Sequence, residues 1–452
     1  MNFEKIYAKL PITIQNILIS SYGSILYFQR YGKFYKKKMQ YLRNRDHKNF
    51  DFQKYQLDSL NKLLLHAYNN SEFYRKKMKN IKLPLKNVKD LAKIPITTKE
   101  ELRTNIKQII TVSEKKAIKG ATGGTTGKSL NILYTCQDMQ ERMAILDYFK
   151  ELHGVYKGMK RASFTGRNLI PVEQKSKVFW RYNRPLRQML FSCFHVSNEN
   201  IPAYIDALNK FKPHSLDGVP SAMCEIARYI LRNDIRLKFK PIAIFPTAET
   251  LLVSDRKLLE KAFHCVVRNQ YASSEGAPFI TECPEGNLHL NIDTGVFEKL
   301  DSHKNVSEML VTSFTTFGTP LIRYKIEDCL EFTNEKCTCG INTPITKAII
   351  GRNSDFLYSR ERGKVGPGHM ANVVKTLPLS IKNVQYIQKK EDQIVVKLVT
   401  DEKLYEKKHL QIMKEEIRKR LGKNMEIVFV FVNEIEREKS GKFRFIKNYL
   451  EV

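Results

Sequence analysis

One stretch in the first third of the chain has the composition of a phosphate-binding loop. It reads Ala121-Thr122-Gly123-Gly124-Thr125-Thr126-Gly127-Lys128-Ser129. Glycines let the backbone approach a polyanion closely, while free N–H groups and threonine hydroxyls can donate hydrogen bonds to phosphate oxygens. Lys128 adds a positive charge. These residues therefore favour the binding of a phosphate chain, and a surface loop without a ligand is the alternative.

The end of this loop matches the P-loop motif G-x-x-x-x-G-K-[ST], but Thr122 occupies the position of the first glycine. A P-loop runs from its lysine and serine directly into a helix. Here residues 130–134 form a short apolar run, which predicts a strand. We therefore expect the loop to join two strands, and this argues against a P-loop NTPase.

Four further motifs follow along the chain, and each is weak when taken alone. They are Tyr-Ala-Ser-Ser-Glu-Gly at 271–276, Pro-Leu-Ile-Arg-Tyr-Lys-Ile-Glu-Asp at 320–328, Gly-Arg at 351–352 and Ser-Gly-Lys-Phe-Arg at 440–444. In this order and spacing, together with the loop, they resemble the superfamily of adenylate-forming enzymes. Its members include acyl-CoA synthetases, peptide-synthetase adenylation domains and luciferases.

The resemblance is narrower at four places, where the chain is similar to the phenylacetate–coenzyme A ligase family. These are residues 66–75, residues 90–99, Pro220-Ser221 and Ala248-Glu249. The similarity runs from about residue 55 to the C-terminus. Residues 10–16 resemble the start of relatives found with capsular-polysaccharide genes.

The resemblance implies an ATP site assembled from these motifs. Residues 122–128 would hold the β- and γ-phosphates of ATP. Residues 247–249, which include Ala248 and Glu249, would lie near the adenine, and Tyr271 would stack on the base.

It also implies the groups that act on the reacting phosphate. Ser274 would contact the α-phosphate, and Glu275 would ligate Mg²⁺, which offsets charge in the transition state. Asp328 would accept hydrogen bonds from both ribose hydroxyls, and Arg352 would reach the nucleotide from the domain junction. Lys442 would be the catalytic lysine that bridges the carboxylate and the α-phosphate as pyrophosphate leaves.

The chain departs from the family pattern at four positions. Gly123 replaces a serine of the loop, Ala272 replaces the usual glycine after the tyrosine, and Glu327 stands where a glycine usually precedes Asp328. The usual hinge aspartate falls on Ser354, with Asp355 beside it. A degenerate homologue without catalysis therefore stays an alternative, although Lys442, Glu275 and Asp328 are all retained.

A second set of residues could bind a metal. Cys283, His289, Cys337 and Cys339 could supply three thiolates and one imidazole, which suit tetrahedral structural Zn²⁺. A similar arrangement occurs in some members of the resembled family. The alternative is two unrelated pairs of half-buried residues, because cysteine is often a core residue. We expect the other five cysteines to be core residues: Cys136, Cys193, Cys224, Cys265 and Cys329.

The charge balance of the chain is strongly basic. Its 452 residues include 77 Lys and Arg against 47 Asp and Glu, a net charge of +30. Attraction to phosphate, nucleic acid or an anionic membrane competes with the simpler interpretation of a lysine-rich surface, which we prefer. We expect no specific nucleic-acid partner, although a basic surface-binding protein remains the alternative of another class.

The densest basic run, residues 30–48, follows Leu10–Gln29, which carries no formal charge. Its polar residues make that segment a poor membrane span. We expect it to pack on the core, with peripheral contact to a membrane surface as the alternative. No signal peptide opens the chain, so we expect a cytoplasmic protein, or one peripheral to the inner face of the membrane.

A composition change near Gly351 and the pattern after it predict a large domain over 1–350 and a small α+β domain over 351–452. The resemblance implies an α/β fold, with mixed sheets flanked by helices in the large domain and the small domain as a mobile lid. The lid would contain a strand, a helix that stops at Gly422, and a second strand over 426–432. In the large domain we expect a helix over 51–80, a capping box at Thr98 and Glu101, and two helices within 201–235.

The resemblance implies that MgATP activates a small carboxylic acid as an acyl-adenylate. The lid would then rotate to withdraw Lys442 and admit a thiol, with coenzyme A as the default acceptor. A carrier-protein thiol, an amine and a cell-envelope sugar hydroxyl remain alternatives, as does adenylation without further transfer. Our candidates for the acyl pocket are Phe164, Val219, Pro220 and Phe245.

Overall fold

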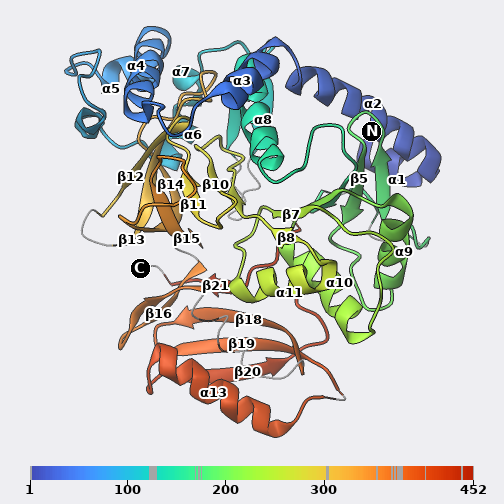
Figure 1. Ribbon diagram of the computed structural model, residues 1–452. Helices are drawn as coiled ribbons and strands as arrows, with labels where there is room; N and C mark the ends of the chain where they lie inside the picture. Colours follow the sequence, from blue (N-terminus) through green and yellow to red (C-terminus); the bar gives the residue numbers. More distant parts are fainter. Residues whose placement is uncertain are drawn as a thin grey trace.

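A computed structural model describes most of the chain (Figure 1). The described residues are 3–121, 130–167, 169–171, 174, 176–301, 305–352, 355–367, 370, 373, 380–402, 404–438 and 441–450. Three large sheets organise them, with six, seven and four strands. The four-stranded sheet and its helix lie apart from the other two sheets in Figure 1, at the C-terminal end of the colour scale. The predicted class, α/β with mixed sheets flanked by helices, is confirmed.

The N-terminal quarter of the chain is helical. Its elements are α1 (Phe3–Lys9), α2 (Ile12–Arg30), α3 (Lys33–Asn44), α4 (Phe52–Asn70), α5 (Glu72–Lys77), the 3₁₀ helix η1 (Val88–Lys93), α6 (Lys99–Thr104) and α7 (Ile106–Ile109). The predicted capping box is present, because the Thr98 and Glu101 side chains each accept a backbone N–H of the other residue. The expected single helix over 51–80 is instead two, because Ser71 adopts an extended backbone that ends α4 and caps α5.

The six-stranded sheet has the order β4-β5-β3-β6-β7-β8 and is parallel except for β4. Its strands are β3 (Arg161–Thr165), β4 (Trp180–Asn183), β5 (Gln188–Ser192), β6 (Ser215–Gly218), β7 (Ala243–Pro246) and β8 (Val266–Val267). The helices of this half are α8 (Cys136–Glu151), α9 (Ile201–Phe211), α10 (Pro220–Arg232) and α11 (Val253–Phe263). The last three pack with the sheet in one apolar core.

The prediction for residues 201–235 missed a strand. Lys212 adopts a left-handed backbone that ends α9, but the turn leads into β6 before α10 begins. The four residues of β6 are too few for a periodic signal. Their pairing with β3 and β7 decides their conformation.

The seven-stranded sheet is antiparallel, with the order β12-β13-β14-β15-β11-β10-β9. Its strands are β9 (Gln270–Tyr271), β10 (Ile280–Glu282), β11 (Leu288–Leu290), β12 (Gly295–Lys299), β13 (Val306–Ser313), β14 (Tyr324–Phe332) and β15 (Ile345–Arg352). Residues of α4 to α7 share one apolar core with it. The hairpin of β1 (Ile118–Ala121) and β2 (Asn131–Tyr134) adds residues to the same core. As predicted, the Gly/Thr-rich loop joins two strands, although its residues 122–129 lie outside the described part.

The last third of the chain contains the predicted strand–helix–strand unit. Its elements are β16 (Leu357–Ser359), β17 (Gly363–Val365), β18 (Ile381–Lys390), β19 (Gln393–Thr400), α13 (Lys407–Leu421), β20 (Glu426–Phe431) and β21 (Ile446–Asn448). Strands β19 and β20 run parallel, with α13 between them, and α13 ends at Gly422 as expected. This unit has a separate apolar core.

The uncharged N-terminal segment forms α2, which contacts β4 and α8. Only Gln15, Ile19 and Gly23 of this helix are buried. The expectation that the segment packs on the core therefore holds for one face of the helix only. No helix in the described residues combines the length and apolar character needed to cross a bilayer.

Candidate active site

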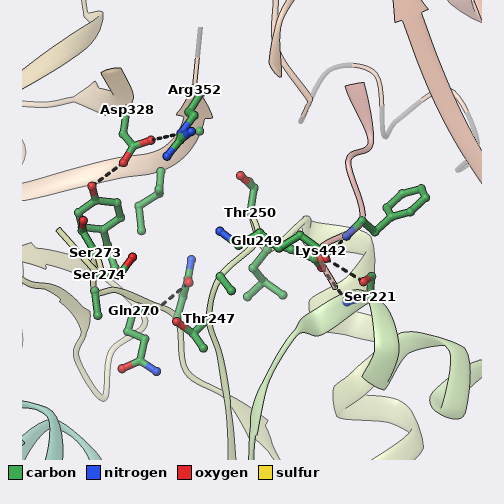
Figure 2. Close-up of a pocket in the computed structure, with 18 of the residues that line it drawn as sticks. Ser221, Thr247, Glu249, Thr250, Gln270, Ser273, Ser274, Asp328, Arg352 and Lys442 are labelled. Atoms are coloured by element: carbon green, nitrogen blue, oxygen red, sulfur yellow. Dashed lines mark hydrogen bonds and ion pairs between the residues drawn. The ribbon is translucent and has the colours of Figure 1, made fainter. Parts of the chain in front are cut away.

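The predicted nucleotide-site residues that the structure describes, which exclude the loop at 122–128, line one cleft of about 1110 Å³ between the two large sheets and the C-terminal unit. Its lining includes residues 247–252, 269–275 and 442–446, which come from three separate parts of the fold. Figure 2 shows Asp328 and Arg352 on one side of this cleft, with Ser221, Glu249 and Lys442 on the other.

Three residues joined by one hydrogen bond and one ion pair lie on the first side of the cleft. Asp328 on β14 and Arg352 on β15 are cross-strand partners, and Arg352 Nε lies 3.5 Å from Asp328 Oδ1. The Tyr271 hydroxyl donates to Asp328 Oδ2 at 2.5 Å. Burial raises the pKa of the Asp328 carboxyl, against the opposing effects of Tyr271 and Arg352. A carboxylate held by its neighbours on an open cleft can accept hydrogen bonds from a polar ligand.

The backbone conformation next to Asp328 explains why a glycine is usual at position 327. Glu327 has a φ of 69°, in the left-handed region that glycine enters without cost. The glycine usual at this position therefore suits the conformation, and Glu327 adopts the same conformation under strain.

Glu275 lines the cleft and is only 3% exposed. Lys99 Nζ donates to its Oε1 at 2.9 Å, and the Tyr324 hydroxyl donates to its Oε2 at 2.5 Å. Each carboxylate oxygen keeps a further lone pair. The residue can therefore bind a divalent cation while both partners hold it in place.

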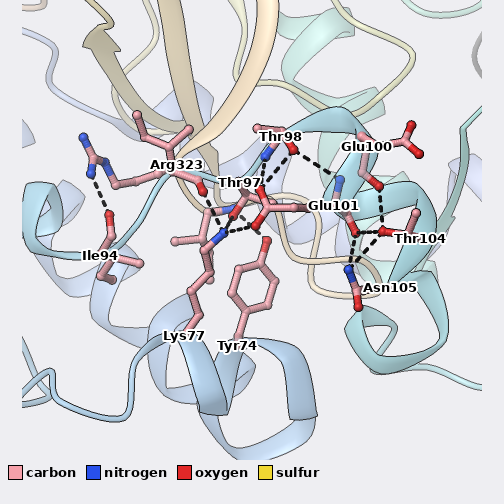
Figure 3. A network of polar contacts seen from close by, with 12 residues as sticks. Tyr74, Lys77, Ile94, Thr97, Thr98, Glu100, Glu101, Thr104, Asn105 and Arg323 are labelled. Atoms are coloured by element: carbon pink, nitrogen blue, oxygen red, sulfur yellow. Dashed lines mark hydrogen bonds and ion pairs between the residues drawn. The ribbon is translucent and has the colours of Figure 1, made fainter.

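A polar network outside the cleft positions both partners of Glu275 (Figure 3). Lys77 Nζ donates to Ile96 O at 2.7 Å and to Glu101 Oε1 at 3.1 Å. Thr97 pairs with the start of β14, where its N–H donates to Arg323 O at 2.9 Å. Lys99 lies two residues after Thr97, and Tyr324 follows Arg323 directly. Neither was predicted, because only the pairing of distant segments brings them to Glu275.

Glu249 lies on the second side and joins the large domain to the C-terminal unit. Its carboxylate accepts from Ser221 N at 3.1 Å, from Ser221 Oγ at 3.0 Å and from the backbone N–H of Phe443. Arg437 Nη1 donates to the same Ser221 Oγ at 2.6 Å. Burial raises the pKa of Glu249, against the opposing effect of Arg437. The resemblance places Glu249 near the adenine, which stays a prediction, and its described partners hold the segment that carries Lys442.

Lys442 lines the cleft from the loop between β20 and β21. Burial lowers the pKa of its ammonium, and the positive charge of Arg352 adds to this effect. Gly441 beside it has a φ of 76°, and a Cβ at this position would lie 2.3 Å from Gly166 Cα. The close approach of these two glycines sets the position of the lysine segment.

Two further features of the cleft concern polar atoms. Gln270 Oε1 is buried without a hydrogen-bond partner among the described residues, so it can accept from a ligand donor.

Asp355 accepts from Arg352 N at 3.3 Å and pairs with Arg444 at 3.0 Å, which links the end of β15 to the lysine segment. Ser354, the position of the usual hinge aspartate, lies outside the described residues.

The candidates for the acyl pocket lie in the core rather than in this cleft. Phe164, Val219, Pro220 and Phe245 are buried in the six-stranded half, and none of them lines the cleft. Six of the large apolar or aromatic side chains that do line the cleft come from α2, α8 and the residue before β10. These are Tyr22, Leu26, Met139, Met143, Leu146 and Phe279. The earlier candidates lay in apolar strand ends, where a sequence pattern does not distinguish a core residue from a pocket residue.

The four candidate metal ligands lie together on the seven-stranded sheet. The ligand atoms of Cys283, His289, Cys337 and Cys339 all lie within 4.8 Å of one another. The Cys283 and Cys337 sulfurs are 3.7 Å apart, and Cys339 Sγ is 3.3 Å from His289 Nε2. Metal–sulfur bonds of about 2.3 Å in a tetrahedron separate sulfurs by about 3.8 Å, close to the first distance.

The environment of His289 suits a neutral ligand. Its Nδ1 lies 2.9 Å from Thr343 Oγ1, a contact that can fix the tautomer and leave Nε2 toward Cys339. Burial lowers the pKa of His289 to about 4, so the ring is neutral at pH 7. Of the other cysteines, Cys193, Cys224 and Cys329 are buried as expected. Cys265 is half-buried, and Cys136 is exposed, contrary to expectation.

Comparison with known proteins identifies the family. A family model described as the CapK C-terminal domain matches residues 357–449. Protein CapK of Staphylococcus aureus is 44% identical over 449 residues, which cover 99% of each chain. The chain belongs to the CapK family. A phenylacetate-coenzyme A ligase of Thermus thermophilus is a more distant relative of this CapK-family chain, 23% identical over 80% of it and 84% of the ligase.

Solved structures show that this CapK-family chain has the fold of adenylate-forming ligases. A 2-hydroxyisobutyryl-CoA ligase in its postadenylation state superimposes with a TM-score of 0.69 at 16% identity, over 88% of this chain and 89% of the ligase. The same ligase in its thioesterification state gives 0.53 over the same shares. The superfamily and family predicted from the motifs are confirmed.

Proposed function

We propose that this chain is an ATP-dependent ligase that activates a carboxylic acid as an acyl-adenylate. The observation that carries the proposal is the entry of Lys442 into the same cleft as Asp328, Arg352 and Glu275. A lysine, an arginine and a buried carboxylate around one cavity suit a reaction in which negative charge develops on phosphate. The 1–350 large domain and 351–452 lid of the sequence interpretation remain part of this proposal.

The nucleotide would lie along the first side of the cleft. Asp328 would accept from the ribose hydroxyls, Tyr271 would lie against the base, and the buried Gln270 Oε1 would accept from the adenine amino group. The side chain of Ser274 would face the α-phosphate, and residues 122–128 would hold the β- and γ-phosphates.

The reacting groups would meet between the two sides. Mg²⁺, bound through Glu275, would offset charge on the phosphates. Lys442 would bridge the carboxylate of the acid and the α-phosphate while pyrophosphate leaves. Glu249 and Ser221 would hold the lysine segment in place during this step.

The acceptor is proposed from the relatives. A phenylacetate-coenzyme A ligase and a 2-hydroxyisobutyryl-CoA ligase both support coenzyme A as the thiol. The 44% identity to Protein CapK supports the second candidate, transfer to a carrier protein, an amine or a cell-envelope sugar in capsular-polysaccharide biosynthesis. A cytoplasmic location fits either acceptor and remains part of the proposal.

Pyrophosphate release from MgATP with a panel of carboxylic acids, with and without coenzyme A, tests the function. We expect acid-dependent release that falls by about 100-fold or more in Lys442→Ala. The control Lys419→Ala, on α13 with a 69% exposed side chain, should match the wild type. Equal release by both variants, or no binding of ATP, would overturn the proposal in favour of a non-catalytic surface-binding homologue.

We also propose that Cys283, His289, Cys337 and Cys339 bind one structural Zn²⁺. The site joins the β10–β11 hairpin to the loop before β15 and leaves no ligand position for chemistry. Elemental analysis should find one zinc per chain, which Cys337→Ser loses together with several degrees of melting temperature. Cys136→Ser, outside the cluster, should keep both. Metal-free wild-type protein with an unchanged melting temperature would contradict this assignment.

A further inference from the structure

Helix α2 presents an apolar face to solvent. Ile14, Ile17, Ile25 and Phe28 recur at helical spacing, and their exposed fractions are 41%, 63%, 55% and 78%. Ser21 is the position between them on the same face. Four large apolar side chains over four turns form a contiguous surface, and such surfaces on a folded chain mark contact with a partner or a membrane.

Of the three buried residues of the same helix, Gln15, Ile19 and Gly23, only Ile19 has a large apolar side chain, whereas a surface helix usually buries its apolar stripe. Gln15 Oε1 accepts from Arg181 Nε at 2.6 Å, and Asn16 Oδ1 accepts from Tyr182 N at 2.9 Å. Gly23 lets the helix approach β4, because a Cβ there would lie 2.0 Å from Asn183 Oδ1. Polar contacts and a close backbone approach therefore hold much of the inner face of α2, while Ile14, Ile17, Ile25 and Phe28 lie outward.

Basic residues lie at both ends of this apolar face. Lys9 precedes the helix, and the exposed Lys33, Lys36 and Lys37 follow it on α3. No acidic residue lies between Lys5 and Asp46. The whole chain carries +30, so its long-range field attracts an anionic surface. An uncharged apolar face between cations matches an anionic lipid surface, which offers apolar chains below negative headgroups.

The adjoining edge of α2 belongs to the cleft. Tyr22, Leu26, Gln29 and Arg30 all line it, and Tyr22 is also 55% exposed. A surface covering the apolar face would therefore meet the protein beside the mouth of the cleft.

We propose that α2 docks this chain on an anionic membrane surface, with Ile14, Ile17, Ile25 and Phe28 at the boundary of headgroups and acyl chains. The helix lies in the plane of the interface, as amphipathic helices of this kind do. The cleft then opens next to the bilayer, within reach of a substrate held there. The docking does not depend on the proposed function, because it can be measured without any substrate.

Vesicle sedimentation tests the docking with the full chain. We expect binding to phosphatidylcholine vesicles that contain about 30% phosphatidylglycerol, and at least tenfold weaker binding to phosphatidylcholine alone. The double variant Ile17→Ser, Phe28→Ser should bind the anionic vesicles at least tenfold more weakly. The matched control Ile412→Ser, Phe431→Ser removes two exposed apolar side chains of the C-terminal unit and should bind like the wild type. Trp180, the single tryptophan, lies on β4 beneath α2 and reports by its fluorescence that each variant is folded.

Three outcomes would overturn the proposal. The first is wild-type protein that stays in the supernatant with anionic vesicles. The second is a double variant that binds as tightly as the wild type, because adsorption would then depend on net charge alone. The third is a dimer of the wild type that the double variant abolishes in light scattering without vesicles, because a second copy of the chain would then cover the face.

Discussion

At the scale of single residues, the protonation of Lys442 should be visible in the pH profile. Burial and Arg352 lower the pKa of Lys442, so the ammonium loses its proton at lower pH than an exposed lysine does. Only the cation can bridge a carboxylate and a phosphate. We therefore expect the rate of adenylation to fall on the alkaline side at a pH below the ordinary lysine pKa of about 10.4.

The variant Lys442→Arg isolates this group. Arginine stays charged over the whole accessible range, so the variant should be slower but should lack the alkaline decrease. The measurement is kcat/KM for pyrophosphate release across the alkaline range. If the decrease persists unchanged in the arginine variant, it belongs to another group and the assignment to Lys442 is wrong.

Lys99 should contribute to stability through Glu275. In Lys99→Met the buried carboxylate keeps the Tyr324 hydroxyl but loses its charged partner. Losing a hydrogen bond to a charged group costs about 2 kcal/mol. Urea unfolding should show this decrease in the free energy of unfolding. In the matched control Lys76→Met the lost partner is Glu72, and both side chains are more than half exposed, so the midpoint should not move. Equal midpoints for all three proteins would refute a structural role for the Lys99 pair.

At the scale of elements, the lysine segment depends on the contact between two glycines. Gly441→Ala places a Cβ 2.3 Å from Gly166 Cα and also strains a backbone with a φ of 76°. The backbone must shift, and Lys442 shifts with it. We expect adenylation to fall by about tenfold or more while ATP still binds, because the nucleotide side of the cleft is unchanged.

The variant Gly363→Ala distinguishes the effect of the contact with Gly166 from the effect of backbone strain. Gly363 has a φ of 68° but has no atom within 4 Å of an added Cβ. Both variants should lose about 1 kcal/mol of stability from the left-handed backbone, but only Gly441→Ala should lose activity. Similar losses of activity in both would show that strain within the C-terminal unit, and not the contact with Gly166, is responsible.

Local patterns predicted the elements better than the contacts between them. The Thr98–Glu101 capping box, the end of α13 at Gly422 and the strands on both sides of residues 122–129 all follow from neighbouring residues, and all are present. Strand β6 has four residues, too few for a periodic signal, so the sequence did not reveal it. The partners of Glu275 and Glu249 come from segments far apart in the chain, and no spacing rule brings them together.

At the scale of the whole molecule, polar contacts hold the C-terminal unit against the large domain. Arg437 Nη1 donates to Ser221 Oγ at 2.6 Å, and Arg232 lies 3.3 Å from Asp401. Interfaces of this polar kind allow domain motion more readily than apolar ones.

The contact of Arg437 should therefore affect the rate of one half-reaction, adenylation, and not the rate of the other, transfer to the acceptor. Arg437→Met removes the bonds to Ser221 Oγ and Gly441 O, both of which hold the lysine segment in the cleft. We expect acid-dependent ATP–pyrophosphate exchange to fall about tenfold, whereas consumption of a synthetic acyl-adenylate by the acceptor changes less than twofold. Arg360→Met, which removes an exposed pair within the C-terminal unit, should leave both rates unchanged. If Arg437→Met lowers both half-reactions equally, the contact supports the cleft as a whole and does not favour one arrangement. A selective loss of exchange would instead mean that this interface stabilises the arrangement in which Lys442 acts, and that breaking it leaves the chain competent for transfer.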